Sequence, residues 1–345
     1  MATGSGLDAQ LGLAAETTWG TAATVDHFVE FNSETLAKNL TFLEPTGLRV
    51  GTKFKRSKRV VVSRTSVSGD IDVDHATKGM GLLWKNALAS AVAVPTAVTG
   101  QTGAYSQVHT PGGFKGLGLT MQVGRPEPST GVVKPFTYTG CKVSKWEFVL
   151  KDNATPTLKL TVDGKDEDTT TTLAAASFIS GASVFDFSQA KITLGGTVAT
   201  TAGVAAVTGG TAMSTIVTDI TLDGTTGMDT ARYGLGNAGK KAEQLENAFP
   251  TLTGKMSAEF NQSELYDVFS ANTTLAMQLT LTGDVIGATT AHYKLDFILP
   301  AVKLKTAPPN VSGPAIVAMS TTFEAYSDEV NAPIQVTIVS DESTL

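Results

Sequence analysis

The chain has 345 residues, of which 41% are hydrophobic and only 17% are charged, and its formal net charge is −6. The length permits two domains, the abundance of Thr, Val, Ala and Gly indicates a mainly β fold with few helices, and the acidic balance argues against a conventional nucleic-acid binder. The single cysteine, Cys141, excludes an intrachain disulfide, and we recognise neither a signal peptide nor a transmembrane run, so we expect assembly in a cytoplasm without a membrane.

Residues 1–24 are small, polar and rich in glycine, and we expect them to form an N-terminal arm. The run from Gly4 to Ala9 has the form GxGxxA. A dinucleotide site of that form needs a strand before it, and only three residues precede this run. A flexible arm is therefore the favoured interpretation.

A first β domain is expected over residues 25–168, with an exposed basic loop at residues 44–62. Between Arg49 and Arg64 the chain has seven cations and no acid. Because the rest of the chain is acidic, such a segment favours a contact between like subunits over phosphate binding, for which it has too few aromatic residues. The cations proposed for this contact are Arg49, Lys53, Lys55, Arg56 and Lys58.

A strand followed by a short helix is predicted over residues 67–88, the stretch around which the first domain is organised. The strand alternates apolar residues with Asp70, Asp72 and Asp74, so one face is apolar and the other is acidic. The three acids do not make a calcium loop, because its glycine and glutamate positions hold other residues. The acidic face is either a solvated surface or the lining of a channel. The helix carries Trp84 as a core residue.

The same pattern returns at residues 252–269, where Gly254 takes the place of Gly69 at an offset of 254 − 69 = 185. Phe269 then replaces Trp84 as the core residue of the helix. Two such units in step predict an internally duplicated domain. The polar positions of the second strand are Lys255, Ser257 and Glu259, so the second face is less acidic than the first.

The rest of the first domain consists of predicted strands at residues 116–123, 136–138, 141–150 and 157–162, with Trp146 in the core. Residues 89–112 are predicted to be a loop. The last strand ends in an acidic tip that contains Asp163, Asp166, Glu167 and Asp168.

A linker rich in Thr, Ala and Ser is expected at residues 169–182, followed by a second β domain at residues 183–345. The segment FDFSQAKITL at 185–194 is similar to FVEFNSETL at 28–36. Residues 197–213 are predicted to be another loop. The four histidines have no metal-ligand spacing, and no nucleophile motif occurs. We therefore expect no catalytic residues, no metal and no cofactor.

Several motifs resemble the major tail tube proteins of long-tailed, siphovirus-type bacteriophages. The resemblance starts at the N-terminal GSGLDAQLGLAAETTWGTAATVDHFVEF and extends over nearly the whole chain. In the second half it rests on FDFSQAKITLGG, IVTDITLDGTTGMDTARYGLGN, PTLTGKMSAEFNQSELYDVF, HYKLDFILPAVKL and FEAYSDE, in that order.

The resemblance implies two tandem tube domains of β-sandwich or barrel type, each with a short flanking helix. It implies rings that stack into a hollow tube through which DNA leaves the capsid. A duplicated chain would form a trimeric ring with pseudo-sixfold symmetry, and a hexamer is the alternative. Tape-measure, tail terminator and distal tail proteins would be its partners, DNA would pass without lasting binding, and the location would be the virion tail.

By the same resemblance, an acidic or neutral lumen would repel phosphates. We place Asp70, Asp72, Asp74, Lys255, Ser257 and Glu259 on strands that face this lumen. The basic loop would contact the acidic tip of the next ring. Two other classes of function stay open at this point: another virion surface protein, such as a capsid decoration or fibre protein, and a β-rich binding module or enzyme.

Overall fold

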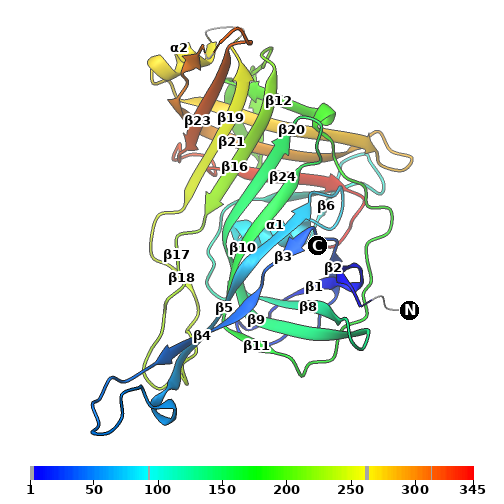
Figure 1. The fold of residues 1–345 in the computed structure, drawn as a ribbon. Coiled ribbons are helices and arrows are strands. Elements are labelled where there is room, and N and C mark those ends of the chain that lie inside the picture. The colour runs from blue at the N-terminus through cyan, green and yellow to red at the C-terminus, as the bar shows by residue number, and fades with distance from the viewer. Residues whose placement is uncertain (1–3, 92–93, 261–263, 312) are drawn as a thin grey trace.

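The computed structural model describes residues 4–91, 94–260, 264–311 and 313–345. The described chain is mainly β, as predicted, with two short α-helices, α1 (Gly81–Leu88) and α2 (Glu264–Ser270) (Figure 1). The strands of the first half are β1 (Gln10–Ala15), β2 (His27–Val29), β3 (Ser33–Glu34), β4 (Ala37–Leu43), β5 (Val61–Asp74), β6 (Thr96–Ala97), β7 (Tyr105–His109), β8 (Leu119–Glu127), β9 (Val132–Lys151), β10 (Thr157–Gly164) and β11 (Asp166–Asp168).

The second half contributes the remaining strands. They are β12 (Ala190–Leu194), β13 (Thr197–Thr201), β14 (Val204–Thr208), β15 (Thr211–Ala212), β16 (Val217–Thr225), β17 (Met228–Asp229), β18 (Leu245–Glu246), β19 (Thr251–Glu259), β20 (Leu275–Val285), β21 (His292–Thr306), β22 (Pro309–Asn310), β23 (Ala318–Ala325) and β24 (Gln335–Ser340).

A long antiparallel sheet runs through both halves in the order β4-β5-β10-β9-β16-β19-β23-β21. The halves meet where β9 pairs with β16, with Leu150 opposite Ile220. Figure 1 shows these long strands side by side across the molecule. In the described part of the chain the sheet does not close into a barrel. It ends at β4 on one side. On the other side β21 and then β22 lie along β23, and β22 pairs with no other described strand.

The two strand faces of this sheet differ because the side chains of a strand alternate between them. Ile71 and Val73 of β5, like Leu158 and Leu160 of β10, are fully buried on the inner face. Behind that face lie further strands: β8, flanked by β1 and β9 in the first half, and β20, flanked by β12 and β21 in the second. The apolar side chains between these layers form the core.

One core serves both halves. Trp84 of α1 packs edge-on against Trp146 of β9 at 5.3 Å between ring centroids, and against Phe297 of β21 at 5.4 Å. Phe148 lies 4.7 Å from Phe297. Phe269 of α2 is only half-buried and packs against the margin of this core. The two halves therefore share both a sheet and a core, which two separately folded domains would not.

The N-terminal segment is part of the fold and not an arm. Residues 10–15 form β1, which pairs with β2 and β8, and Leu11 and Leu13 are fully buried. Leu11 and Leu13 alternate with small residues and give this strand its buried face. The high glycine content of the segment obscured that alternation in the sequence. Residues 1–3 of the expected arm lie outside the described residues.

Two segments expected to be loops also contain strands. Within residues 89–112, of which 92–93 lie outside the described residues, β7 pairs with the C-terminal strand β24. Within residues 197–213, β13 and β14 form a hairpin. Residues 169–182 contain no helix or strand and connect β11 to β12 along one side of the molecule (Figure 1).

The strand registers of the two halves coincide. Val162 lies opposite Gly69, and Phe323 lies opposite Gly254. On the other side of β10 and β23, the ladder is interrupted by one extra residue at equivalent places, Ser144 in β9 and Lys305 in β21, at an offset of 305 − 144 = 161. The same offset relates Val162 to Phe323, so a bulge in one strand pair recurs in its counterpart.

A second irregularity recurs in the same way. The ladder between β8 and β9 shifts after Leu119, opposite Cys141, and that between β20 and β21 shifts after Leu275, opposite Val302. The 3₁₀ turn Gly6–Asp8 before β1, capped by Ser5, is matched by Phe187–Gln189 before β12, capped by Asp186. Residues 186–194 thus correspond to 5–13, and not to 28–36 as their sequence suggested.

Candidate assembly surfaces

The outer face of the long sheet carries the residues predicted to line a lumen. Asp70, Asp72 and Asp74 project from β5 on the side opposite Ile71 and Val73, and all three are half-exposed. The residues of β19 are on the same face of the sheet: Lys255 is exposed, and Ser257 and Glu259 are half-exposed. The structure therefore brings the two predicted sets together on one continuous surface.

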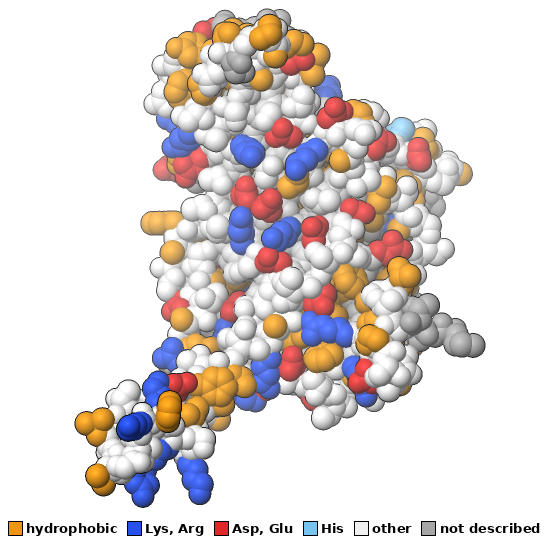
Figure 2. Space-filling view, viewed as in Figure 1, with side chains coloured by type: hydrophobic (Ala, Val, Ile, Leu, Met, Phe, Trp, Pro, Cys, Tyr) orange, Lys and Arg blue, Asp and Glu red, His pale blue; other side chains and the backbone are white. Residues whose placement is uncertain are grey.

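This outer face is not uniformly acidic. Lys159 of β10 lies 2.9 Å from Asp70, and Lys145 of β9 lies 3.1 Å from Asp223 of β16. Figure 2 shows cationic and anionic side chains interspersed over the front of the sheet. In the middle of this face, from residue 70 of β5 to β19, the acids are Asp70, Asp72, Asp74, Glu147, Asp219, Asp223 and Glu259, and the lysines are Lys145, Lys151, Lys159 and Lys255. Seven carboxylates against four lysines leave a formal excess of three negative charges there. Towards its margins the face also carries Glu324, Arg64, Lys303 and Lys305, which reduce the excess over the whole face to one.

Burial changes the titration of Asp72 on this face. Desolvation, together with the neighbouring charge of Asp74, raises the pKa of Asp72 above its ordinary value. Asp70 behaves differently because it accepts hydrogen bonds from Lys159 and from Thr161 at 2.8 Å. Against the opposing effect of burial, these contacts lower the pKa of Asp70.

The basic loop is the tip of a hairpin formed by β4 and the start of β5, and it projects from the body of the molecule (Figures 1 and 2). Most of its side chains are exposed, although Arg56 and Arg59 are half-exposed. Its apolar residues have no cover: the exposed fractions of Leu48, Val50 and Phe54 are 102%, 98% and 87%. Lys55 pairs with Glu44 of the same hairpin at 2.5 Å. A projecting segment that is both cationic and apolar is suited to contact another protein surface.

The acidic tip that was expected to contact this loop already forms contacts with other residues of its own chain. Asp163 is buried, and its carboxylate accepts from Lys241 at 2.6 Å and from Gln244 at 2.8 Å. Asp166 forms an ion pair with Lys240. Glu167 is half-exposed, and Asp168 accepts hydrogen bonds from Thr170 and Thr171. Asp163 is thus inaccessible to a neighbouring ring, because residues 226–250 of the second half fold over it.

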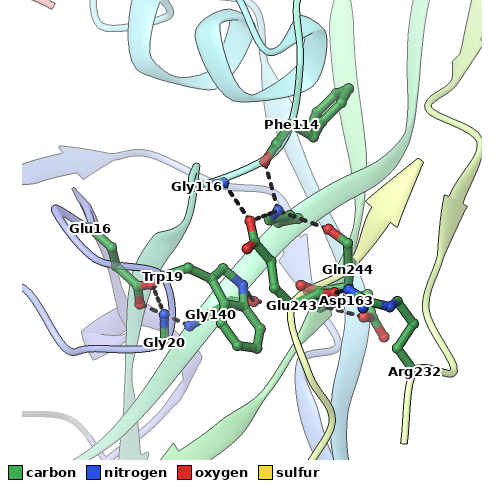
Figure 3. Close-up of polar contacts among 11 residues, drawn as sticks. Glu16, Trp19, Gly20, Phe114, Gly116, Gly140, Asp163, Arg232, Glu243 and Gln244 are labelled. Atoms are coloured by element: carbon green, nitrogen blue, oxygen red, sulfur yellow. Dashed lines mark hydrogen bonds and ion pairs between the residues drawn. The ribbon is translucent and has the colours of Figure 1, made fainter.

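Figure 3 shows the polar network under residues 226–250, which the sequence did not predict. The Lys142 ammonium of β9 donates to the Phe114 carbonyl at 2.6 Å, to Glu243 at 2.8 Å and to the Gln244 carbonyl at 2.9 Å. Burial lowers the pKa of Lys142 and, in spite of the Lys241 ion pair, raises the pKa of Asp163. In the sequence, Lys142 and Asp163 could not be told from Lys145 and Lys159, which lie in the same strands and are not buried.

In the described part of the chain, no group of three or more His, Cys, Asp or Glu side chains is placed to hold a metal ion. Within the same residues, no helix has both the length and the apolar character needed to span a membrane. Cys141 is fully buried, and burial raises the pKa of its thiol.

An open-edged β-sheet with a projecting hairpin and a polar outer face offers edges and surfaces on which another copy could pair. A family model described as phage tail tube protein matches residues 6–325, and the chain belongs to that family. Its role is therefore structural, as a subunit of the tail tube of a phage virion. No curated protein matches the chain.

Proposed function

We propose that this protein polymerises as stacked rings into a hollow tail tube through which DNA is delivered. The observation that carries the proposal is the long sheet. It has the order β4-β5-β10-β9 in the first half, repeats it as β16-β19-β23-β21 in the second, and ends in unpaired strand edges. Edge-to-edge pairing of copies around an axis would satisfy those edges and close the sheet into a ring.

We infer that the chain arose by duplication of one tube domain. Each copy of the chain then contributes two sectors to a ring, one from each half. The shared strand order, registers and bulges of the two halves support this. The pairing of β9 with β16 then joins two sectors within a chain, and the pairing of β22 with β4 of the next copy would join two chains. A ring of six sectors accordingly needs three copies, so we favour a trimer with pseudo-sixfold symmetry over a hexamer.

The outer face of the long sheet is proposed to line the lumen. Its excess of negative charge repels DNA phosphates, and its interspersed ion pairs leave no concentrated cationic patch that would hold them. DNA would therefore pass without lasting binding. Tape-measure, tail terminator and distal tail proteins are the expected partners in the tail, and assembly is expected in the host cytoplasm.

Electron microscopy of the purified protein, concentrated at low and at high salt, tests this proposal. Rings or tubes with a central hole support it. Particles that associate into sheets or solid fibres at every salt concentration would rule it out.

A further inference from the structure

Residues 226–250 and the basic hairpin are equivalent connections in the two halves. The first connects β16 to β19, and the second connects β4 to β5. The offset is 254 − 69 = 185 from β5 to β19 and 222 − 36 = 186 from Leu36, just before β4, to Leu222 of β16, so the two connections are almost equal in length. Both begin as a continuation of the strand ladder, in β17 with β18 and in β4 with β5. One folds back on its own chain, whereas the other projects (Figure 1).

The connection that folds back covers a specific part of the first half. Lys241 reaches Asp163 at 2.6 Å under it, and the Tyr233 ring lies under the Arg64 guanidinium at 4.6 Å. The backbone N–H of Thr65 donates to the Gly239 carbonyl at 2.9 Å. The covered residues lie on β5 and β10, next to the junction of the halves.

The equivalent part of the second half has no such cover. Glu324 takes the place of Asp163 (324 − 163 = 161), and 31% of its side chain is exposed, against 11% for Asp163. Phe249 takes the place of Arg64 (249 − 64 = 185), and 94% of it is exposed. Both residues line an apolar groove of about 490 Å³ together with Trp146, Pro250, Tyr326 and Ile334.

We propose that the basic hairpin of one copy docks on this groove of its neighbour in the same ring, as residues 226–250 dock on the first half of their own chain. The inference rests on the proposed ring. The contacts of residues 226–250 with the first half can be shifted by the same offsets. The contact of Tyr233 with Arg64 then becomes one of Leu48 (233 − 185) with Phe249, and that of Lys241 with Asp163 becomes one of Arg56 (241 − 185) with Glu324.

Two independent properties fit this transfer. Leu48 and Phe249 are almost fully exposed in a single copy, and the contact would shield both from water. The charges also match, because the hairpin is cationic, whereas Glu324 stands with Glu246 at the groove and with Asp328 and Glu329 beyond it. Glu324 is held in place by Lys305 at 3.2 Å and by the Tyr326 hydroxyl at 2.5 Å.

Disulfide trapping in assembled full-length protein tests the contact. The variant carries Leu48→Cys together with Phe249→Cys, and the buried Cys141 does not compete. We expect oxidation to give a denaturing-gel ladder that ends at three linked chains, because each ring closes on itself. Each single-cysteine variant is the matched control and should give no species larger than a dimer.

The outcomes separate the contact from the ring. Tubes without a cross-link, or a ladder that continues past six chains and so runs from ring to ring, would overturn the docking and leave the tube intact. A ladder that ends at six would keep the docking and overturn the trimer. Absence of rings and tubes from the unmodified protein would remove the basis of both.

Charge exchange provides a second readout in case the cysteine variant does not assemble. Arg56→Glu and Glu324→Arg should each reduce the yield of rings several-fold, and the double variant should restore it. Equal yields from the two single variants and the unmodified protein would contradict the contact.

Discussion

Gly69 and Gly254 occupy equivalent places in the two halves and meet the same obstacle. A Cβ added to Gly69 would lie 2.4 Å from the carbonyl oxygen of Thr35, and one added to Gly254 would lie 2.6 Å from that of Thr221, with the Phe323 ring nearer still at 2.3 Å. The offset is 254 − 69 = 185 for the glycines and 221 − 35 = 186 for the threonines. In both halves the neighbouring backbone therefore approaches so closely that only glycine fits. The backbone carbonyls that set this limit cannot rotate away as a side chain could.

Alanine at either glycine should therefore destabilise the chain. We expect Gly69→Ala and Gly254→Ala each to lower the free energy of unfolding by about 1–3 kcal/mol, since overpacking forces the backbone to shift. Gly113→Ala is the control, because its Cβ would have nothing within 4 Å. Denaturant unfolding measures all three, and a Gly69 variant as stable as the Gly113 variant would contradict the geometry.

The shared aromatic core predicts that the two halves unfold together. Heating should give one calorimetric transition, because Phe297 of the second half packs against Trp84 and Phe148 of the first. Phe297→Ala should lower the free energy of unfolding by about 3–5 kcal/mol and preserve the single transition. Phe249→Ala, at an exposed site, should have little effect on the unassembled chain. Two separated transitions would show that the halves are independent domains.

Acid should destabilise the fold through His75. This ring is buried and accepts a hydrogen bond from the Trp84 indole N–H at 2.8 Å, and burial lowers its pKa from 6.5 to about 4. The unfolded chain binds the proton at higher pH, so the contribution of His75 is complete above pH 6.5 and is lost as the pH falls toward 4. That loss reaches about 3 kcal/mol. His75→Gln should reduce the slope of unfolding free energy against pH over this range and leave the part due to His109, whose pKa burial also lowers to about 4. An unchanged slope would refute the assignment.

The ion pair between Lys241 and Asp163 should contribute more to stability than the more exposed pair between Lys240 and Asp166. Lys241→Met leaves the Asp163 carboxylate buried without its cation, which we expect to cost about 3–5 kcal/mol. Lys240→Met, at the more exposed pair with Asp166, should cost about 0–1 kcal/mol. Chemical denaturation compares the two, and equal costs would mean that burial of the pair is unimportant.

Charge on the proposed lumen face should control passage of DNA. Asp72→Lys with Glu259→Lys changes the formal charge in the middle of this face from −3 to +1 per chain. Tubes of this variant should retain DNA at low salt and release it as salt rises. Asp284→Lys with Glu30→Lys, outside that face, is the control. Equal DNA retention by the two variants would place the lumen on another surface.

Local patterns in the sequence predicted part of this fold. Alternation at residues 67–74 and 252–259 indicated strands with one apolar face, and both are present, as is the short helix after each. The constant offset between the two units was visible because these elements are contiguous in the chain. The β1 strand was missed, because Leu11 and Leu13 stand among glycines and alanines that suggest an exposed arm.

Such local patterns could not predict contacts between segments that are distant in the chain. Asp163 looked like the tip of an exposed turn, and it is buried because a segment far along the chain, around Lys241, folds across it. The strand β7 was hidden in an Ala- and Thr-rich stretch, because its partner is the C-terminal strand β24. The outer face could be predicted residue by residue on β5 and β19, but Lys145, Lys151 and Lys159 come from β9 and β10, whose registers only the fold defines.

The central claim is that three duplicated chains form one ring of the tail tube. Cryo-electron microscopy of assembled tubes, with the copies in each ring counted and the sectors averaged without imposed symmetry, tests it most directly. We predict three copies and six sectors, in which neighbouring sectors differ in their projecting connection, a folded-back segment alternating with a docked hairpin. Six copies in a ring, or six identical sectors, would contradict the account.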